Sequence, residues 1–256
     1  GVSSAASDVY KRQVWNKGCD SSYSWAMKYK HLNHRGTSSE ICTKIMDALK
    51  SESNPRGTFS HETSEQEIHM CFTGGEPLLP KNQRAIIAIL EQFKTVRGGP
   101  IPGTNFFKPS NTPQFITIET NGTQKLTDIS IAYFNNKGIF TSELFFSVSP
   151  KLFTVSGESR GRSIKPDVVK QYQWVSRKGQ LKFVVGDSDK QWDELKEVLA
   201  IFREAGIEYP VYIMPVGATE EDQFEIAQKV SDKALKNGFN VSARVHTYIY
   251  GNRIGT

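Results

Sequence analysis

Two short segments of this chain combine residue types that can do chemistry. Cys19 stands in the run Gly18-Cys19-Asp20-Ser21, which puts a thiol beside a carboxylate and a hydroxyl. The second segment, Thr73-Gly74-Gly75-Glu76-Pro77, follows an apolar run. Its two glycines allow positive φ and close approach of a ligand to the backbone, and Glu76 has a carboxylate suited to hold an amine. The second segment therefore predicts a binding turn, whereas the first taken alone also fits an ordinary turn.

Polar or glycine-rich clusters end each of five expected strands. These clusters are residues 73–76, 119–123, 149–151, 186–187 and 214–217. In barrels and open α/β sheets, ligands collect at the carboxyl ends of the strands. The five clusters therefore predict one shared site.

Strand-like apolar runs alternate with helical patterns along the chain. The strands are expected at residues 67–73, 114–119, 144–149, 181–185 and 211–214. Apolar residues at helical spacing are clearest between Ile86 and Phe93 and between Trp192 and Phe202. Short apolar strands separated by helices predict a parallel sheet covered by helices, which is an α/β fold.

Composition narrows the classes of function. The chain has 256 residues, 38% of them hydrophobic, which is enough for a sizeable core. Its formal net charge of +5 suits an anionic small molecule, and without a Lys/Arg block it gives little support for direct binding of nucleic acid. No apolar run approaches the ~20 residues of a membrane span. The scattered cysteines, Cys19, Cys42 and Cys71, favour a reducing, cytoplasmic compartment over a disulfide framework.

The chain is expected to contain one domain, at residues 14–256. Residues 3–13 resemble the in-frame translation of an adaptor used for sequencing libraries, so residues 1–13 are expected to be a disordered scar outside the fold. On this interpretation the natural upstream sequence and the first strand are missing, and the exposed sheet edge predicts poor solubility. Residues 96–113, rich in Gly, Pro, Asn and Thr, are too long for an ordinary connection and are expected to form a surface insertion or lid.

Five motifs in a fixed order carry a family resemblance. They are Cys-Asp-Ser-x-x-Ser-Trp from Cys19, Phe-Thr-Gly-Gly-Glu-Pro-Leu-Leu from Phe72, Glu-Thr-Asn-Gly-Thr from Glu119, Ser-Val-Ser-Pro-Lys from Ser147, and Arg-Val-His from Arg244 with Tyr-Gly-Asn from Tyr250. Together they resemble 7-carboxy-7-deazaguanine synthase, a radical S-adenosylmethionine (SAM) lyase, and more closely its bacteriophage branch. The resemblance implies a partial (β/α)6 barrel, similar to a TIM barrel, that lacks its first strand.

The resemblance also implies a reaction and its cofactors. A [4Fe–4S] cluster with three thiolate ligands leaves one iron open, and in this family that iron binds SAM, whose cleavage yields a 5′-deoxyadenosyl radical. The radical abstracts hydrogen from 6-carboxy-5,6,7,8-tetrahydropterin, whose ring contracts with loss of ammonia to 7-carboxy-7-deazaguanine. The cofactor supplies the chemistry and the protein aims it. An electron donor such as flavodoxin and a homodimer are implied as well, and the fragment itself is expected to be inactive.

Metal and substrate positions carry over residue by residue. Cys19 matches the third cluster ligand, while a rival alignment makes it the first and puts Tyr23 and Ala26 where ligands belong. Ser21 matches a position whose hydroxyl binds Mg²⁺, a hard ion suited to oxygen ligands, and a helix N-cap is the alternative role for that residue. The positions expected to contact the substrate are Thr73, Glu119 and Thr256.

A further set of positions matches the SAM site. Its members are Asp20, Gly74, Gly75, Glu76, Asn121, Ser149, Pro150, Lys151, Met214, Pro215 and Gly217. Glu76 is expected to be the partner of the SAM ammonium group. Met214 stands where many relatives have Gln and cannot donate that residue's hydrogen bonds, so the backbone would make the contact there. Two alternatives stay open: an activase of a glycyl-radical protein, and a non-catalytic pterin- or nucleotide-binding homologue.

Overall fold

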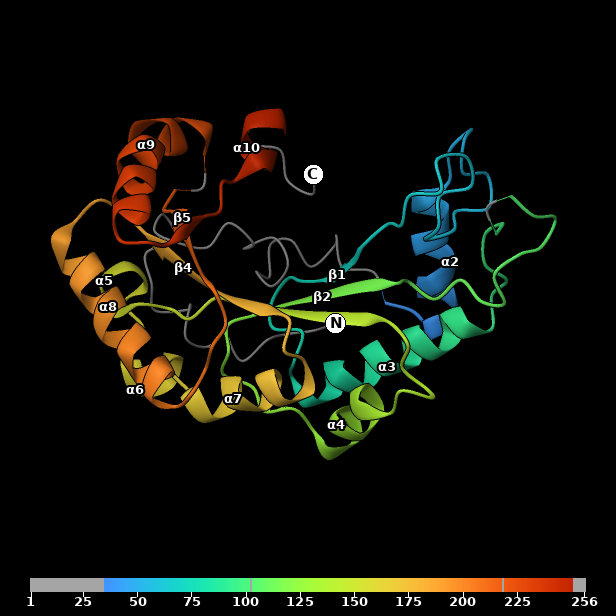
Figure 1. Cartoon of the computed structure of the whole chain (residues 1–256), viewed down its shortest axis with the longest axis horizontal. Coiled ribbons are helices and arrows are strands. Elements are labelled where there is room, and N and C mark those ends of the chain that lie inside the picture. The colour runs from blue at the N-terminus through green and yellow to red at the C-terminus, as the bar shows by residue number, and fades with distance from the viewer. Residues whose placement is uncertain (1–34, 102, 218, 251–256) are drawn as a thin grey trace.

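The computed structural model describes residues 35–101, 103–217 and 219–250, and their central feature is a six-stranded parallel sheet (Figure 1). The strands are β1 (Met70–Phe72), β2 (Phe115–Thr120), β3 (Glu143–Val148), β4 (Gly179–Val185), β5 (Val211–Pro215) and β6 (Asn240–Val241). They lie in the sheet in their order along the chain, and each pairs in parallel with the next. All five predicted strands are present, with ends shifted by a few residues, so the predicted α/β fold is confirmed.

In the described residues, helices connect the successive strands, and one further helix precedes β1 and another follows β6. They are α2 (Ser38–Leu49), α3 (Pro80–Lys94), α4 (Asp128–Asn135), α5 (Phe153–Ser156), α6 (Arg160–Ser163), α7 (Pro166–Val175), α8 (Asp189–Glu204), α9 (Glu220–Lys236) and α10 (Val245–Tyr250). In Figure 1, α3, α4 and α7 lie below the sheet, and α8 and α9 continue an arc outside it. Within the described ranges, no helix is both long enough and apolar enough to cross a bilayer.

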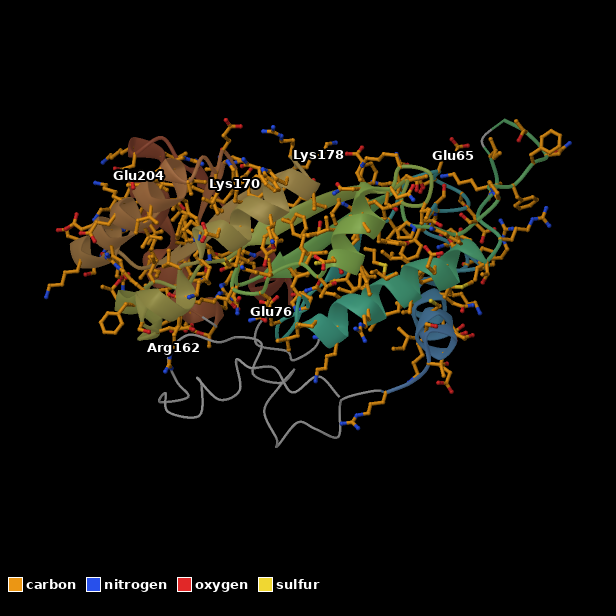
Figure 2. All side chains as sticks on the ribbon, turned by 90° about the horizontal axis from the view of Figure 1, so that it is seen from below. Glu65, Glu76, Arg162, Lys170, Lys178 and Glu204 are labelled. Carbon is orange, nitrogen blue, oxygen red and sulfur yellow. The ribbon has the colours of Figure 1, made fainter. Side chains whose placement is uncertain are left out.

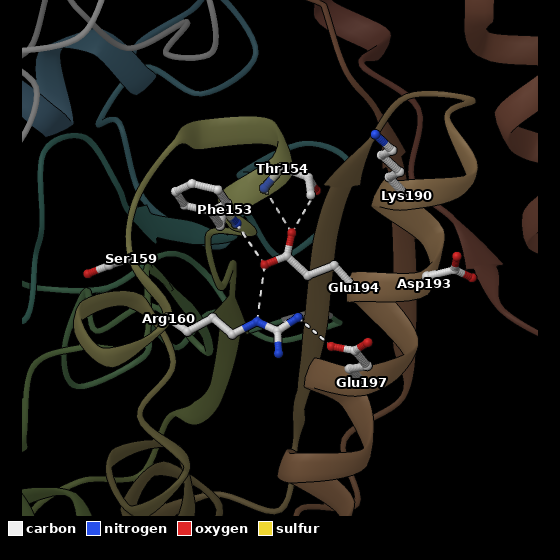
Figure 3. A pocket seen from close by; sticks show the side chains of 8 residues that line it. All are labelled: Phe153, Thr154, Ser159, Arg160, Lys190, Asp193, Glu194 and Glu197. Carbon is white, nitrogen blue, oxygen red and sulfur yellow. Dashed lines mark hydrogen bonds and ion pairs between the residues drawn. The ribbon is translucent and has the colours of Figure 1, made fainter.

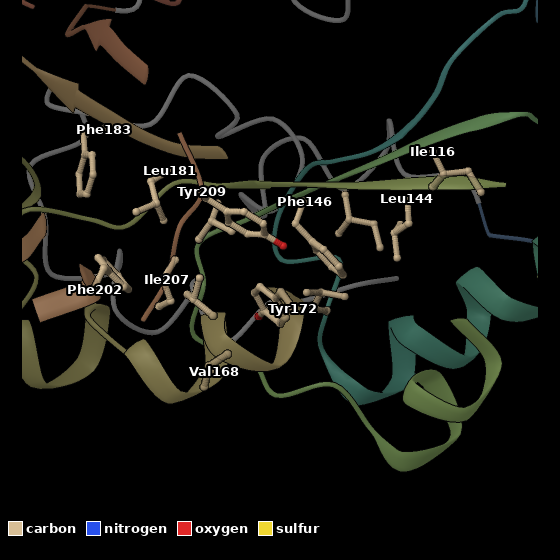
Figure 4. Packing of buried hydrophobic residues seen from close by; sticks show 14 of the residues in the cluster. Ile116, Leu144, Phe146, Val168, Tyr172, Leu181, Phe183, Phe202, Ile207 and Tyr209 are labelled. Atoms are coloured by element: carbon tan, nitrogen blue, oxygen red, sulfur yellow. The ribbon is translucent and has the colours of Figure 1, made fainter. Parts of the chain in front are cut away.

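One face of the sheet packs against these helices and holds the core. Burial alternates along β2 and β4, as expected when successive side chains point to opposite faces. Ile116, Phe146 and Phe183 are 0–1% exposed on the covered face (Figure 4). Tyr172 of α7 stacks on Phe146 with ring centroids 4.8 Å apart, and this contact joins helix to sheet. The other face is only partly covered, so its side chains are the ones available to a ligand.

Local sequence signals set where several elements begin. Thr37 and Thr219 form capping boxes at the starts of α2 and α9, and each side chain accepts a backbone N–H of the first helical turn. Proline stands in the first turn of α3 and of α7. At the start of β4, the ring of Tyr209 lies where a side chain on Gly179 would project, since a Cβ there would be 2.5 Å from a ring atom. Glycine is therefore required by close packing at that position.

The expected insertion, residues 96–113, lies between α3 and β2. It contains an antiparallel bridge between Pro100 and Phe107, and it packs on the segment before β1. The guanidinium groups of Arg56 and Arg97 each lie 4.4 Å from the Phe107 ring, and Lys108 pairs with Glu67. Because it leads into the amino end of β2, this surface insertion lies at the opposite end of that strand from the predicted site. Its position does not favour a lid over that site.

Candidate functional site

The turn after β1 has the backbone geometry that its sequence predicts. Gly74 and Gly75 have φ of +80° and +55°, values that side-chain-bearing residues rarely adopt. Thr73 precedes them directly at the carboxyl end of β1. The turn therefore places two glycine backbones without side chains at the strand end, where a ligand can approach them.

Glu76 ties this turn to the end of β2. Its carboxylate is 1% exposed and accepts hydrogen bonds from Leu78 N (2.9 Å), Thr120 Oγ1 (2.8 Å) and Asn121 N (2.9 Å). Burial raises the pKa of this carboxyl, and these hydrogen bonds together with Lys151 act in the opposite direction. The structure thus gives Glu76 a role in joining the two loops, and its contact with the SAM ammonium group stays a prediction. Both its oxygens already hold the two loops together, because the backbone donors there have no strand partner.

Across the partly covered face, a polar row joins β1, β2 and β4. Thr73 Oγ1 donates to Glu119 Oε2 at 2.8 Å, and Lys182 Nζ lies 3.0 Å from Glu119 Oε1. The Lys182 side chain is 15% exposed and that of Glu119 is 39% exposed. The predicted substrate residues Thr73 and Glu119 are therefore in direct contact. Their cationic neighbour Lys182 was not among the predicted site residues.

The ion pair of this row spans the strand between its two members. Glu119 is paired in register with Ser147 of β3, and Ser147 with Gln180 of β4. Two interstrand spacings amount to about 10 Å, so Glu119 and Lys182 must lean toward each other across β3. Gln180 Nε2 donates to Ser147 Oγ at 2.9 Å and fills the gap beside them. The arrangement depends on the small side chain of Ser147.

Cys71 also belongs to this face. It lies within β1, as predicted, but it is exposed and not buried like an ordinary free cysteine of a core. Loss of solvation and, to a smaller extent, the charge of Glu119 raise the pKa of the thiol, and Lys182 lowers it; together they bring this pKa to about 11. A thiol with this pKa is protonated at neutral pH, so its described surroundings do not prepare it as a thiolate.

The end of β3 brings in the Ser149-Pro150-Lys151 cluster. Ser149 N donates to Thr120 O at 2.8 Å, which fixes this loop against the end of β2. Lys151 Nζ lies 3.3 Å from Ser149 Oγ, and its charge acts on both Glu76 and Glu158. Burial raises the pKa of Glu158, while Lys151 and Arg162 oppose that shift. Figure 2 shows Glu76 and Arg162 on one side of the molecule and Lys178, which precedes β4, on the other.

Backbone contacts dominate the β2 and β5 ends. Asn121 Oδ1 accepts from Thr123 N (3.0 Å) and Thr123 Oγ1 (2.6 Å), so that side chain shapes its own turn. After β5, Gly217 has φ of +130°, and the buried Gln223 donates from Nε2 to the carbonyl oxygens of residues 215, 216 and 217. Met214 is half-buried and alternates with the buried Pro215 along the strand. Gln223 thus fixes the backbone of this loop, and a contact of SAM with the backbone at Met214 stays a prediction.

Some predicted site residues cannot be placed. Cys19, Asp20, Ser21 and Thr256 lie outside the described residues. In the part of the chain that the structure describes, no three His, Cys, Asp or Glu residues are grouped to hold a metal ion. Cys42 is buried in α2 and contacts Ile89 O at 3.5 Å. The described residues therefore do not fit an iron–sulfur cluster, and the cluster assignment depends on Cys19.

A pocket of about 560 Å³ lies away from this row, between α5, α6 and α8 (Figure 3). Its central group is Glu194, which accepts from Phe153 N (2.9 Å), Thr154 N (2.8 Å) and Thr154 Oγ1 (2.6 Å). Arg160 bridges Glu194 and Glu197. These contacts cap the start of α5 and pair Arg160 with Glu194 and Glu197, so we assign this cluster a structural role.

The chief residue missed by sequence reasoning is Lys182. A signal was present, because Leu181, Phe183 and Val185 alternate with Lys182 in one strand, and such alternation places the lysine on the face opposite the core.

No protein-family model matches the chain, and no curated protein matches it either.

Proposed function

We propose that the chain is a radical SAM protein of the 7-carboxy-7-deazaguanine synthase kind, and that the row Thr73–Glu119–Lys182 with the adjoining strand ends binds SAM and a carboxylated pterin. The observation that carries the proposal is the convergence of the motif residues. The glycine turn follows β1, Glu119 lies near the carboxyl end of β2 and the Ser149–Lys151 loop follows β3; these three strands are neighbours, and hydrogen bonds link their ends.

The arrangement supports a division of the site into two parts. The half-buried backbone at Gly74 and Gly75, which carries no side chains, fits together with the Ser149–Lys151 loop the amino-acid and ribose portions of SAM. The row around Glu119 fits a flat heterocycle, because a carboxylate can accept the paired N3–H and 2-amino donors of a pterin. SAM, when its cluster is present, supplies the radical, and this chain's residues orient the pterin and limit its contact with water.

The fold supports the same assignment at a coarser level. In Figure 1 the helices follow an arc outside the sheet, and the polar row occupies the face that the described helices leave partly uncovered. We propose that this curved sheet is part of a (β/α) barrel, with the row on its inner side. Ligands at the carboxyl ends of barrel strands are the general pattern for such folds.

Ligand-detected NMR on the purified chain tests the proposal. Saturation-transfer difference spectra would be recorded with SAM and with pterin-6-carboxylate, each at millimolar concentration so that weak binding is seen. We expect signals from both ligands, with Gly75→Val weakening SAM and Glu119→Gln weakening the pterin. Glu143→Gln is the matched control, because Glu143 forms a similar ion pair with Lys178 near the amino ends of β3 and β4.

The outcomes separate the competing functions. Binding of pterin without SAM would favour the non-catalytic pterin-binding homologue, and binding of SAM without pterin would favour an activase. Absence of both signals, or equal losses in Glu119→Gln and Glu143→Gln, would overturn the assignment of this face as a ligand site.

A further inference from the structure

Lys182 is the cation at the centre of the polar row. Its Nζ contacts Glu119 Oε1 at 3.0 Å, and its side chain is 15% exposed. An ammonium group has three N–H donors. Within the described residues, Nζ donates one hydrogen bond, to Glu119, so two N–H groups stay available on the partly covered face.

The other described cations near the strand ends do not reach this position in the same way. Lys151 lies in the loop after β3, beside Ser149, and Arg162 belongs to α6. Lys182 projects from β4 itself, two residues beyond Gln180, whose partner Ser147 is in register with Glu119. The charge of Lys182 is felt at Cys71 of β1, on the far side of the row. Its charge therefore acts on the middle of the face.

We propose that Lys182 is the specificity-determining residue of this face and selects a ligand that carries a carboxylate group. The inference rests on the proposed function, and it adds the residue that distinguishes a carboxylated heterocycle from an uncharged one. A ligand carboxylate would share Nζ with Glu119 and form a charge-assisted hydrogen bond there. Glu119 would keep its contact with Thr73.

This role follows from the geometry of the ion pair. Burying a Lys–Glu pair costs solvation free energy, and the attraction between the two charges offsets only part of that cost. A second anion that binds Nζ therefore meets a cation that is already desolvated and held in place. Methionine at this position would keep most of the side-chain volume and remove the charge. Arginine would keep the charge and alter the hydrogen-bond geometry.

The test compares two fluorescent probes, pterin-6-carboxylate and unsubstituted pterin, by titration with the full chain. We expect the wild type to bind the carboxylated probe at least about tenfold more tightly, the effect of one charge-assisted hydrogen bond. Lys182→Met removes that preference, and Lys182→Arg retains part of it. Lys178→Met, which breaks a Lys–Glu pair at the amino end of β4, leaves the preference intact.

The double variant Lys182→Met/Glu119→Gln removes both charges of the pair, so it provides a folded comparison if Lys182→Met unfolds with an unpaired carboxylate. It too must show no preference for the carboxylated probe. The inference is overturned if the wild type binds both probes with equal affinity. It is also overturned if Lys182→Met or the double variant still prefers the carboxylated probe. Either result contradicts the role of Lys182 but not the ligand site itself. Binding of neither probe overturns the site and the inference together.

Discussion

Replacing Glu194 by Gln tests the energetics of the α5–α8 contact. The carboxylate is 5% exposed and accepts from two backbone N–H groups, one hydroxyl and the guanidinium of Arg160. A glutamine keeps one acceptor oxygen and turns an NH₂ group toward donors on the other side. The donors on one side of the group therefore lose their acceptor.

The expected magnitude follows from these contacts. Hydrogen bonds to a charged acceptor contribute roughly 1.5–3 kcal/mol each, and a lost helix cap costs roughly 0.5–2 kcal/mol. Phe153 and Thr154 are exposed, so water compensates part of the loss. We expect Glu194→Gln to lower the free energy of unfolding by about 2 kcal/mol, which for a chain of this length lowers the Tm by roughly 4–8 °C.

The effect should depend on pH. Burial acts to raise the pKa of Glu194, but hydrogen bonds from Thr154 and Phe153 and the Arg160 pair outweigh it, so the folded-state pKa is lowered. A carboxyl with a lowered pKa stabilises the fold above its unfolded value of about 4.3, and that contribution is lost as pH falls through the folded value. The difference between wild type and Glu194→Gln should therefore be constant above about pH 6 and shrink toward pH 3.

Urea unfolding monitored by the fluorescence of buried Trp192, on the same helix, measures the difference. Glu197→Gln is the matched control, because Glu197 pairs with the same Arg160 at 2.5 Å but is 62% exposed. Exposed pairs contribute little, so this control should change stability by less than about 0.5 kcal/mol. Equal effects of the two substitutions, or a difference for Glu194→Gln that does not vary with pH, would refute the reasoning.

Two further predictions concern the sheet. Gly179→Ala places a Cβ 2.5 Å from the Tyr209 ring, and a hydrogen bond from the tyrosine hydroxyl holds that ring in place. Thermal melts should therefore show that the free energy of unfolding falls by about 1–3 kcal/mol and that adding Tyr209→Leu recovers part of the loss. An unchanged Tm would contradict the close packing. Alkylation of Cys71, followed by peptide mass spectrometry, should be slow at neutral pH and accelerate toward pH 11, because the rate follows the thiolate fraction. Glu119→Gln should speed this reaction and Lys182→Met should slow it, and the reverse order would show that these charges do not act on the thiol.

The strands were predictable where the pattern was local. Leu181, Phe183 and Val185 alternate with polar or smaller residues, and this period of two marks β4 and its buried face without any knowledge of its neighbours. The glycine turn was also predictable from the sequence, since adjacent glycines before a glutamate indicate positive φ. In contrast, β6 is only Asn240–Val241, and its place in the sheet comes from pairing with β5.

The candidate site divides in the same way. Residue types and spacing predicted that Thr73 and Glu119 lie near strand ends, because the apolar run of a strand and the polar residues that end it are adjacent in the sequence. The contact between Glu119 and Lys182 joins residues 63 positions apart and exists only because β2, β3 and β4 align in one register. Likewise, whether the carboxylate of Glu76 meets a ligand or backbone N–H groups depends on how closely the end of β2 approaches it, and tertiary packing alone decides that distance.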